Sequence, residues 1–194
     1  MGKGTLFVIS APSGAGKSTL IARIRQMFPH IRYSISCTSR PPRKGEAEGV
    51  DYYFASTDKF RLMIQRDEFL EWKEVHGNLY GTPVAPVNEC LASVRRMILD
   101  IDVEGANEVF KKVPGAVGIF VTAPSITILE QRLRLRGTDS EQSIRTRMVN
   151  AAREMEQAGM FKYQIINDDL EKAVEELAGI ISKESGQSIP ETCL

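Results

Sequence analysis

The residues best suited to chemistry stand together near the start of the chain, between an apolar run and a helical pattern. Gly14 and Gly16 are followed directly by Lys17, a cation, and Ser18, a hydroxyl. Small residues let successive backbone N–H groups turn towards phosphate oxygens, and a helix that begins here points its positive end at the same place. We expect Lys17 to reach the outer phosphates and Ser18 to bind Mg²⁺. This is the pattern of a P-loop.

The motif departs from the strict P-loop pattern at one position. The strict pattern has glycine five residues before Gly16, where this chain has Ala11. Alanine disfavours positive φ, so we expect the loop to begin in an ordinary backbone conformation. A turn that merely caps a helix is the alternative interpretation. The order of strand, glycines, lysine and serine favours the phosphate loop.

The elements that would hold this loop follow from the alternation of apolar runs and helical patterns. Strand–helix–strand units predict an α/β fold, a parallel sheet flanked by helices as in P-loop NTPases. The expected strands are residues 5–10, 33–37, 51–54, 69–75, 97–101, 118–121 and 164–166. The expected helices are residues 17–27, a segment that begins near Thr57, 83–95, 105–112, 126–136, a segment that begins near Ser140, and 170–182.

Residues 33–95 break this rhythm with short strands, and they predict an inserted lobe with mixed, partly antiparallel pairing. We therefore expect a single domain with four parts. These are a core of residues 1–32, 96–131 and 149–185, the lobe of residues 33–95, a helical lid of residues 132–148, and a tail of residues 186–194.

Composition limits the classes of partner. The chain has 194 residues, enough for a sizeable core, and its 25 basic and 25 acidic residues leave no net charge. We therefore expect no nucleic-acid binding and no membrane binding. The three cysteines have no metal-binding spacing, and the N-terminus leads directly into a strand. Both features indicate a cytoplasmic protein with free thiols and no signal peptide.

A second candidate for phosphate chemistry is the acid at the end of a buried strand. The apolar run from Met97 to Leu99 ends at Asp100, and Asp102 and Glu104 follow. Beside a P-loop, a carboxylate in this place lies near the metal, often through water. Ordinary acids at a strand end are the alternative, and the neighbouring phosphate loop favours the functional interpretation.

Two arginines form the third candidate. Arg40 and Arg43 lie three residues apart, with two prolines between them that stiffen the spacing. Guanidinium groups bind phosphate through two parallel hydrogen bonds. A solvated basic loop is the alternative. The residues that follow, Glu46 and the run 49–54, favour a phosphate site.

At this point the chain resembles the guanylate kinase family, whose members phosphorylate GMP with ATP. The resemblance runs from about residue 5 to residue 181 and rests on several motifs in a fixed order, so it is more specific than a P-loop alone. The matching motifs are residues 11–19 (APSGAGKST), 38–43 (TSRPPR), 49–54 (GVDYYF), 68–72 (EFLEW), 77–82 (GNLYGT), 99–105 (LDIDVEG), 132–137 (RLRLRG) and 166–169 (INDD).

The resemblance implies a role in purine nucleotide metabolism, with ATP and GMP as substrates, dGMP as a further acceptor and Mg²⁺ as cofactor. It implies a GMP site formed by Ser36, Arg40, Arg43, Tyr52, Glu71, Tyr80, Thr82 and Asp102. It implies an ATP site formed by Ala11, Pro12, Ser13, Gly14, Ala15, Gly16, Lys17, Ser18, Thr19, Arg132, Arg136, Asn167 and Asp168. The implied catalytic residues are Lys17, Arg40, Arg43, Arg136 and Arg147, and the implied metal ligands are Ser18 and, through water, Asp100.

Elementary chemistry supports the role of Glu71 independently. Guanine carries two donors on one edge, N1–H and the 2-amino group, and a carboxylate can accept from both. Adenine lacks this pair of donors, so a buried Glu71 would penalise the wrong base. A strand glutamate that faces solvent is the alternative.

Five arginines between residues 132 and 147 indicate a mobile lid over the phosphates. The alternative is a charged helix hairpin on the surface, and we expect Arg134 and Arg145 to be bystanders. The acceptor is already a phosphate oxyanion, so placement and charge neutralisation would suffice without a general base.

Two other functions fit parts of this pattern. One is another P-loop kinase for a nucleoside or sugar phosphate, which Glu71 and Tyr80 argue against. The other is a protein-binding scaffold built on the guanylate kinase fold, which the intact phosphate loop argues against. A homo-oligomer is compatible with each of these interpretations.

Overall fold

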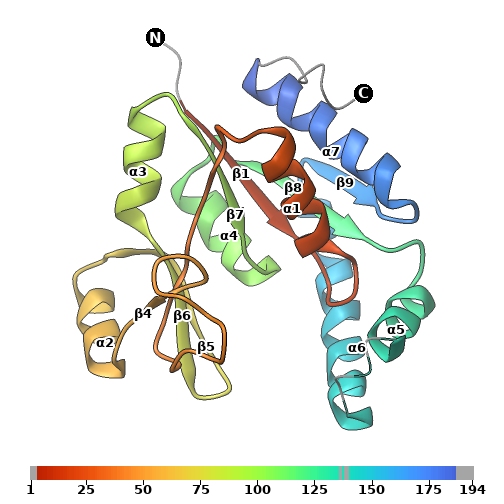
Figure 1. Cartoon of the computed structure of the whole chain (residues 1–194), viewed down its shortest axis with the longest axis horizontal. Coiled ribbons are helices and arrows are strands. Elements are labelled where there is room, and N and C mark those ends of the chain that lie inside the picture. Colours follow the sequence, from red (N-terminus) through yellow and green to blue (C-terminus); the bar gives the residue numbers. More distant parts are fainter. Residues whose placement is uncertain (1–3, 136, 138–139, 187–194) are drawn as a thin grey trace.

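A computed structural model describes residues 4–135, 137 and 140–186 (Figure 1). Its main sheet has five parallel strands in the order β2-β7-β1-β8-β9. These strands are β1 (Thr5–Ser10), β2 (Arg32–Tyr33), β7 (Arg96–Asp100), β8 (Val117–Thr122) and β9 (Tyr163–Ile166). The register pairs Ile9 with Asp100, so the end of β1 and the end of β7 are neighbours.

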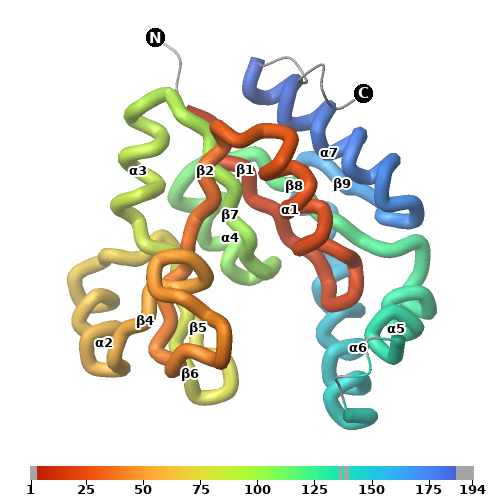
Figure 2. Tube along the Cα trace, in the orientation of Figure 1, coloured from red at the N-terminus to blue at the C-terminus, as the bar shows by residue number. Residues whose placement is uncertain are grey.

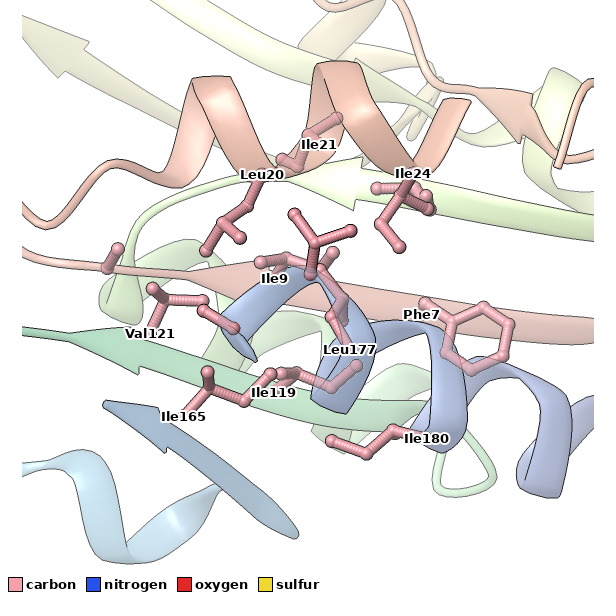
Figure 3. Packing of buried hydrophobic residues seen from close by; sticks show 14 of the residues in the cluster. Phe7, Ile9, Leu20, Ile21, Ile24, Ile119, Val121, Ile165, Leu177 and Ile180 are labelled. Atoms are coloured by element: carbon pink, nitrogen blue, oxygen red, sulfur yellow. The ribbon is translucent and has the colours of Figure 1, made fainter. Parts of the chain in front are cut away.

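Helices cover both faces of this sheet. On one face, α1 (Lys17–Met27) and α7 (Leu170–Ser185) pack on β1, β8 and β9, and Figure 3 shows Leu20, Ile24 and Leu177 among the strand side chains. On the other face, α3 (Val84–Ala92) and α4 (Val103–Lys112) bury side chains against Leu6, Val8 and Leu99. Burial on both faces explains why the central strands are almost wholly apolar. The predicted fold class is confirmed.

The inserted lobe contains a second sheet in the order β4-β3-β6-β5. Its elements are β3 (Cys37–Thr38), β4 (Tyr53–Phe54), α2 (Thr57–Gln65), β5 (Phe69–Val75) and β6 (Asn78–Pro83). Two pairs are antiparallel, β3 with β6 and β5 with β6, whereas β3 and β4 are parallel. Figure 2 shows the chain passing from β2 into this lobe and returning through α3 to β7. Mixed pairing in the lobe agrees with the prediction.

The remaining helices form a pair on the other side of the core from the lobe (Figure 1). They are α5 (Ile126–Leu135) and α6 (Glu141–Glu156), followed by a short 3₁₀ turn, Ala158–Met160. Ser140 caps α6 by accepting the backbone N–H of Ser143, as the sequence predicts. No helix within the described residues is long and apolar enough to span a membrane.

One strand prediction was wrong, and one strand was not predicted. The predicted strand 33–37 is divided between the two sheets, because Ser34 still pairs with Ile98 of β7 whereas Ser36 accepts the N–H of Tyr53. The sequence analysis also missed β6, because its glycine and proline are residues more typical of loops than of strands. Gly81 is required there, because a Cβ would lie 2.9 Å from the carbonyl oxygen of Glu71 on the neighbouring strand.

Helix boundaries also differ from prediction, by a few residues. The predicted helix 83–95 is α3, which ends at Ala92, with Pro83 at its N-cap position. Helix α4 starts earlier than predicted, at Val103, because Asp102 caps it. Helix α7 extends to Ser185 and ends at Gly186, whose φ of 64° suits glycine. The division into core, lobe, lid and tail stays a prediction.

Candidate active site

The phosphate loop follows β1 and leads into α1. Gly14 and Gly16 have φ of 93° and 88°, values that favour glycine. A Cβ at Gly16 would lie 2.4 Å from Nδ2 of Asn167, so a larger residue would also displace that amide. Ala11 is not among the described residues with positive φ, in agreement with the prediction. The backbone at the start of α1 is thus shaped by its two glycines.

Lys17 and Asp100 lie together where β1 and β7 end. The Nζ atom of Lys17 is 2.7 Å from Oδ1 of Asp100 and donates to the carbonyl oxygen of Ile101 at 3.1 Å. The hydroxyl of Tyr33 donates to Oδ2 of the same carboxylate at 3.3 Å. Burial, together with the Asp100 carboxylate, raises the pKa of Tyr33 above its usual range. Tyr33 therefore stays a neutral donor to Asp100.

A cavity of about 390 Å³ opens beside Asp100, between the main sheet and the lobe. Five residues predicted to bind GMP line it, and they come from the connection before β3, the loop before β4, β5, β6 and the segment after β7. The lining residues are Ser36, Tyr52, Glu71, Lys73, Val75, Tyr80, Gly81, Asp100, Ile101 and Asp102. We call this space the acceptor cavity.

Glu71 lies at the inner wall of the acceptor cavity and is 8 % exposed. Its Oε1 accepts the hydroxyl hydrogen of Thr82 at 2.5 Å, which places the predicted Thr82 behind Glu71 instead of in the cavity lining. Burial raises the pKa of Glu71, while Thr82, Lys73 and Lys112 act in the opposite direction. The site therefore holds a buried carboxyl whose charge depends on nearby partners.

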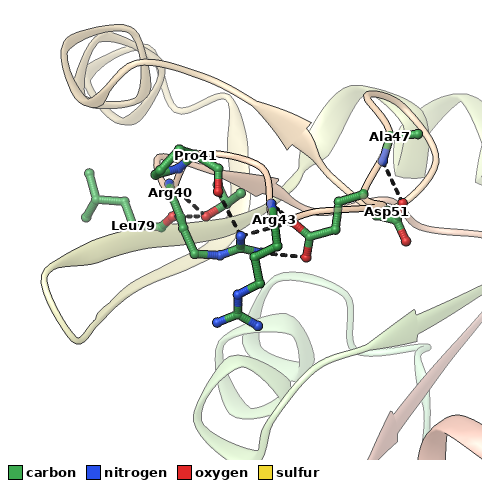
Figure 4. A network of polar contacts seen from close by, with 8 residues as sticks. Arg40, Pro41, Arg43, Ala47, Asp51 and Leu79 are labelled. Carbon is green, nitrogen blue, oxygen red and sulfur yellow. Dashed lines mark hydrogen bonds and ion pairs between the residues drawn. The ribbon is translucent and has the colours of Figure 1, made fainter.

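Arg40 and Arg43 leave the same loop (Figure 4) but have different surroundings. The Arg40 guanidinium donates to both carboxylate oxygens of Glu46, at 2.8 and 2.9 Å, and lies 5.5 Å from the ring centroid of Tyr52. The Glu46 carboxylate also accepts the backbone N–H of Arg43 at 2.7 Å. The Arg43 side chain is exposed and has no ion pair within the described part of the chain.

Asp102 forms the boundary between the acceptor cavity and α4. Its Oδ1 accepts the N–H of Gly105 at 2.9 Å, and its Oδ2 makes an ion pair with Lys73 of β5. This arrangement fixes the carboxylate at the start of a helix, where the helix dipole also favours negative charge.

A second cavity, of about 420 Å³, lies beside the phosphate loop. Its lining residues are Gly14, Gly16, Thr19, Arg132, Leu135, Asn167, Asp168 and Leu170. The side chain of Asn167 donates to the carbonyl oxygen of Ala15 at 2.7 Å, and Arg132 donates to the backbone oxygen of Asn167 at 2.9 Å. The guanidinium of Arg147 reaches the loop from α6, 3.2 Å from Oγ of Ser13. We call this space the donor cavity.

Comparison with known proteins decides between the interpretations. The family description that matches residues 3–184 is that of guanylate kinase. The chain belongs to the guanylate kinase family. The guanylate kinase of Carboxydothermus hydrogenoformans is 50% identical over 184 residues, which cover 95% of this chain and 90% of the relative. That of Geobacter metallireducens is 46% identical over 182 residues, covering 94% and 90%.

A solved structure from the same family extends this agreement to the fold. The crystal structure of guanylate kinase from Anaplasma phagocytophilum superposes with a TM-score of 0.74 at 29% identity. The match covers 100% of this chain and 90% of that one. The fold of this chain therefore agrees with its family.

In this guanylate kinase family member, six predicted site residues line the donor cavity and six line the acceptor cavity. The predicted residues that line neither cavity are Ala11, Pro12, Ser13, Ala15, Lys17, Ser18, Arg40, Arg43, Thr82 and Arg147. Arg136 lies outside the described residues. The predicted bystander Arg134 is tied to Glu130 and Glu141 at the surface. Sequence reasoning missed Tyr33, Glu46 as the partner of Arg40, and Lys73. A period-two pattern shared with Glu71 on β5 is the signal that could have found Lys73.

Proposed function

We propose that this chain phosphorylates GMP to GDP with ATP, the reaction of the family to which it belongs, and accepts dGMP as well. One observation carries the proposal: the Lys17–Asp100 pair joins the phosphate loop to a cavity whose inner wall holds the buried carboxyl of Glu71. A triphosphate and a guanine nucleotide would thus meet at Asp100. Recognition through base and phosphate would leave the 2′-hydroxyl without a required contact, which supports dGMP as a further acceptor.

On the donor side, we assign the triphosphate to the loop from Ala11 to Thr19. Backbone N–H groups at the start of α1 and the Lys17 ammonium would hold its phosphates. Arg132, Asn167 and Asp168 line the donor cavity and would contact the nucleoside. Arg147 already contacts Ser13 and would turn to the transferring group, together with Arg136.

The residues at the end of β7 suit Mg²⁺. Asp100 offers carboxylate oxygens and the exposed Ser18 offers a hydroxyl, and this set of hard oxygen donors fits an ion that keeps several waters. When bound with ATP, the ion supplies charge neutralisation at the phosphates. Asp100 would act through water, and Ser18 directly.

On the acceptor side, we assign the base to Glu71, with Ser36, Thr82 and Asp102 near it. We assign the phosphate to the arginines and tyrosines of the lobe, Arg40, Arg43, Tyr52 and Tyr80. Arg40 is oriented by Glu46 and stacked near Tyr52, so little of its freedom is left to lose on binding. Arg43 is exposed and would bind the phosphate through a guanidinium that has no other ion pair within the described residues.

The chemistry then consists of placement and charge neutralisation. An oxygen of the GMP phosphate attacks the γ-phosphorus of ATP in line, the bond from that phosphorus to the β,γ-bridging oxygen breaks, and ADP leaves. Lys17 and the arginines neutralise the charge on the transferring group.

We propose that the lobe of residues 33–95 and the lid of residues 132–148 close over the core and exclude water, because water would otherwise hydrolyse ATP. The free buried thiols of Cys37 and Cys90 fit a cytoplasmic enzyme.

A coupled assay that follows ADP formation tests the proposal with a panel of acceptors. We expect turnover with GMP and dGMP, and at least about 10²-fold lower kcat/KM with AMP, UMP and dTMP. Equal turnover with AMP would contradict the assignment of Glu71 to the base. No acceptor-dependent turnover at all would contradict the proposed activity and favour a scaffold.

A further inference from the structure

A cation without an assigned role lies among the carboxylates of the acceptor cavity. Lys73 stands on β5 two residues after Glu71, so both side chains face the same side of the small sheet. Its Nζ makes an ion pair with Asp102 and lies 3.9 Å from Oε2 of Glu104. Besides the acceptor cavity, Lys73 lines a third, smaller cavity of about 200 Å³. Arg153 and Glu154 of α6 also line this third cavity. Lys73 and Asp102 are thus shared by the linings of these two cavities.

The ion pair holds Asp102 without using up its capacity to bind. Oδ1 of Asp102 accepts one backbone N–H from Gly105, and Oδ2 faces Lys73. A carboxylate has about four lone-pair positions, so each oxygen can accept a further hydrogen bond. Asp102 is therefore fixed in place and still available to a donor that enters the acceptor cavity.

Asp102 and Glu71 approach each other across Gly105. A Cβ at Gly105 would lie 3.0 Å from Oε2 of Glu71 and 3.5 Å from Oδ1 of Asp102. Both carboxylates border the same backbone position, so their negative charges disfavour each other, and Glu104 adds a third negative charge near Asp102. The ammonium of Lys73 is within ion-pair distance of both Asp102 and Glu104. Its positive charge therefore reduces the repulsion between Asp102 and the other carboxylates, Glu71 and Glu104.

We propose that Lys73 is a positioning residue that determines base specificity. By fixing Asp102 beside Glu71, it builds a two-carboxylate acceptor for a base edge that carries both an N1–H and a 2-amino group. This role rests on the proposed function, and it acts through Asp102 without contact to the phosphates. Without the ammonium, Asp102 would turn away from Glu71, and the second N–H of the guanine 2-amino group, whose first N–H binds Glu71, would lose its partner.

The substitution Lys73→Met tests this role, because methionine keeps most of the side chain and removes the charge. The dissociation constants of GMP and inosine monophosphate, which lacks only the 2-amino group, are measured by calorimetry. We expect GMP to bind about tenfold more weakly and inosine monophosphate to change by less than about twofold. The KM for ATP should not change, because Lys73 does not line the donor cavity.

Three further variants make the test specific. Lys73→Arg keeps the positive charge and should retain the wild-type preference for GMP over inosine monophosphate. Lys73→Gln repeats the charge removal with a polar side chain, should Lys73→Met fail to fold. Lys111→Met is the matched control, because Lys111 lies on α4 and pairs with the exposed Glu108, outside both cavities. It should bind both nucleotides like the wild type.

The outcomes separate the role of Lys73 from the proposed function. Equal losses for GMP and inosine monophosphate, or no loss for either, would overturn the role of Lys73 while the enzyme still formed GDP. Loss of the preference for GMP in Lys73→Arg would overturn it too. A wild-type chain that formed no GDP from GMP would instead overturn the proposed function.

Discussion

The donor and acceptor sides of the site are built in different ways. The donor side depends on backbone: Gly14 and Gly16 shape one short loop between a buried strand and a helix. The acceptor side depends on side chains from several short strands and the loops between them. There Glu46 orients Arg40, Thr82 contacts Glu71, and Lys73 holds Asp102.

This difference has a consequence for how each side responds to substitution. A loop defined by backbone tolerates change except where φ or the chemistry demands one residue type. A site assembled from side-chain pairs loses function in steps, because each pair positions one group. Substitutions should therefore affect turnover most on the donor side and the KM for GMP most on the acceptor side.

The largest expected effect is that of Lys17→Ala. Lys17 is the donor-side cation paired with Asp100, and we assign it to the transferring phosphoryl group. Its loss should lower kcat by about 10²–10⁴-fold, comparable to the loss of one preorganised transition-state contact. Steady-state kinetics at saturating ATP and GMP measure it, with Lys111→Ala as control. Turnover close to that of the wild type would remove Lys17 from the reaction.

A smaller effect is expected from Glu71→Gln, and it should change the KM for GMP instead of kcat. The amide would place an NH₂ against one guanine donor, so the KM for GMP should rise about 10²-fold while the KM for ATP hardly changes. In the wild type, kcat/KM for GMP should fall as the pH drops through the raised pKa of Glu71, because only the carboxylate accepts both donors. Equal changes in both KM values would place Glu71 outside the base site.

The substitution Glu46→Gln probes a pair one step further from the nucleotide. Arg40 and Glu46 are largely buried together, with side chains 11% and 19% exposed. Without the charge on Glu46, Arg40 is less well oriented, and the KM for GMP should rise about tenfold. The matched control Glu108→Gln removes an exposed partner of Lys111 and should leave the KM unchanged. A lower KM for GMP would show that Glu46 competes with the phosphate for Arg40.

The same contrast explains what the sequence could predict. The phosphate loop is ten consecutive residues between a strand and a helix, so its elements and its glycines follow from local pattern. The buried strand that leads to Asp100 also follows from local pattern, because its central residues are apolar, while the metal-binding role of Asp100 stays a prediction. Helix starts at Ser140 and Asp102 depend on one side chain each, and only the first was recognised.

The acceptor lobe could not be derived to the same depth. Its strands β3 and β4 have two residues each, too few for a period to be visible. The glycine in β6 reads as a loop, although it is needed for close approach to Glu71 of β5. The partners of Arg40 and Asp102 depend on which strands lie side by side, and no local pattern gives that information. Family resemblance supplied the residue names, and the structure supplies their pairings.

The smallest effect expected from these variants concerns stability. Glu71→Gln, which should weaken GMP binding, should make the folded protein more stable. Burial raises the pKa of Glu71 in the folded chain. Between the ordinary glutamate pKa and this raised value, the folded state binds more protons than the unfolded state, so stability falls as the pH rises through that window.

The Glu71→Gln variant has no titrating carboxyl at this position, and its amide oxygen can still accept from Thr82. The variant should be more stable than the wild type near pH 7, on the order of 1 kcal/mol. This gain should disappear near pH 4, and urea denaturation at both pH values measures it. A variant less stable than the wild type near pH 7 would mean that Lys73, Lys112 and Thr82 outweigh the cost of burying the charge, and that the carboxylate stabilises the acceptor side as well as reading the base.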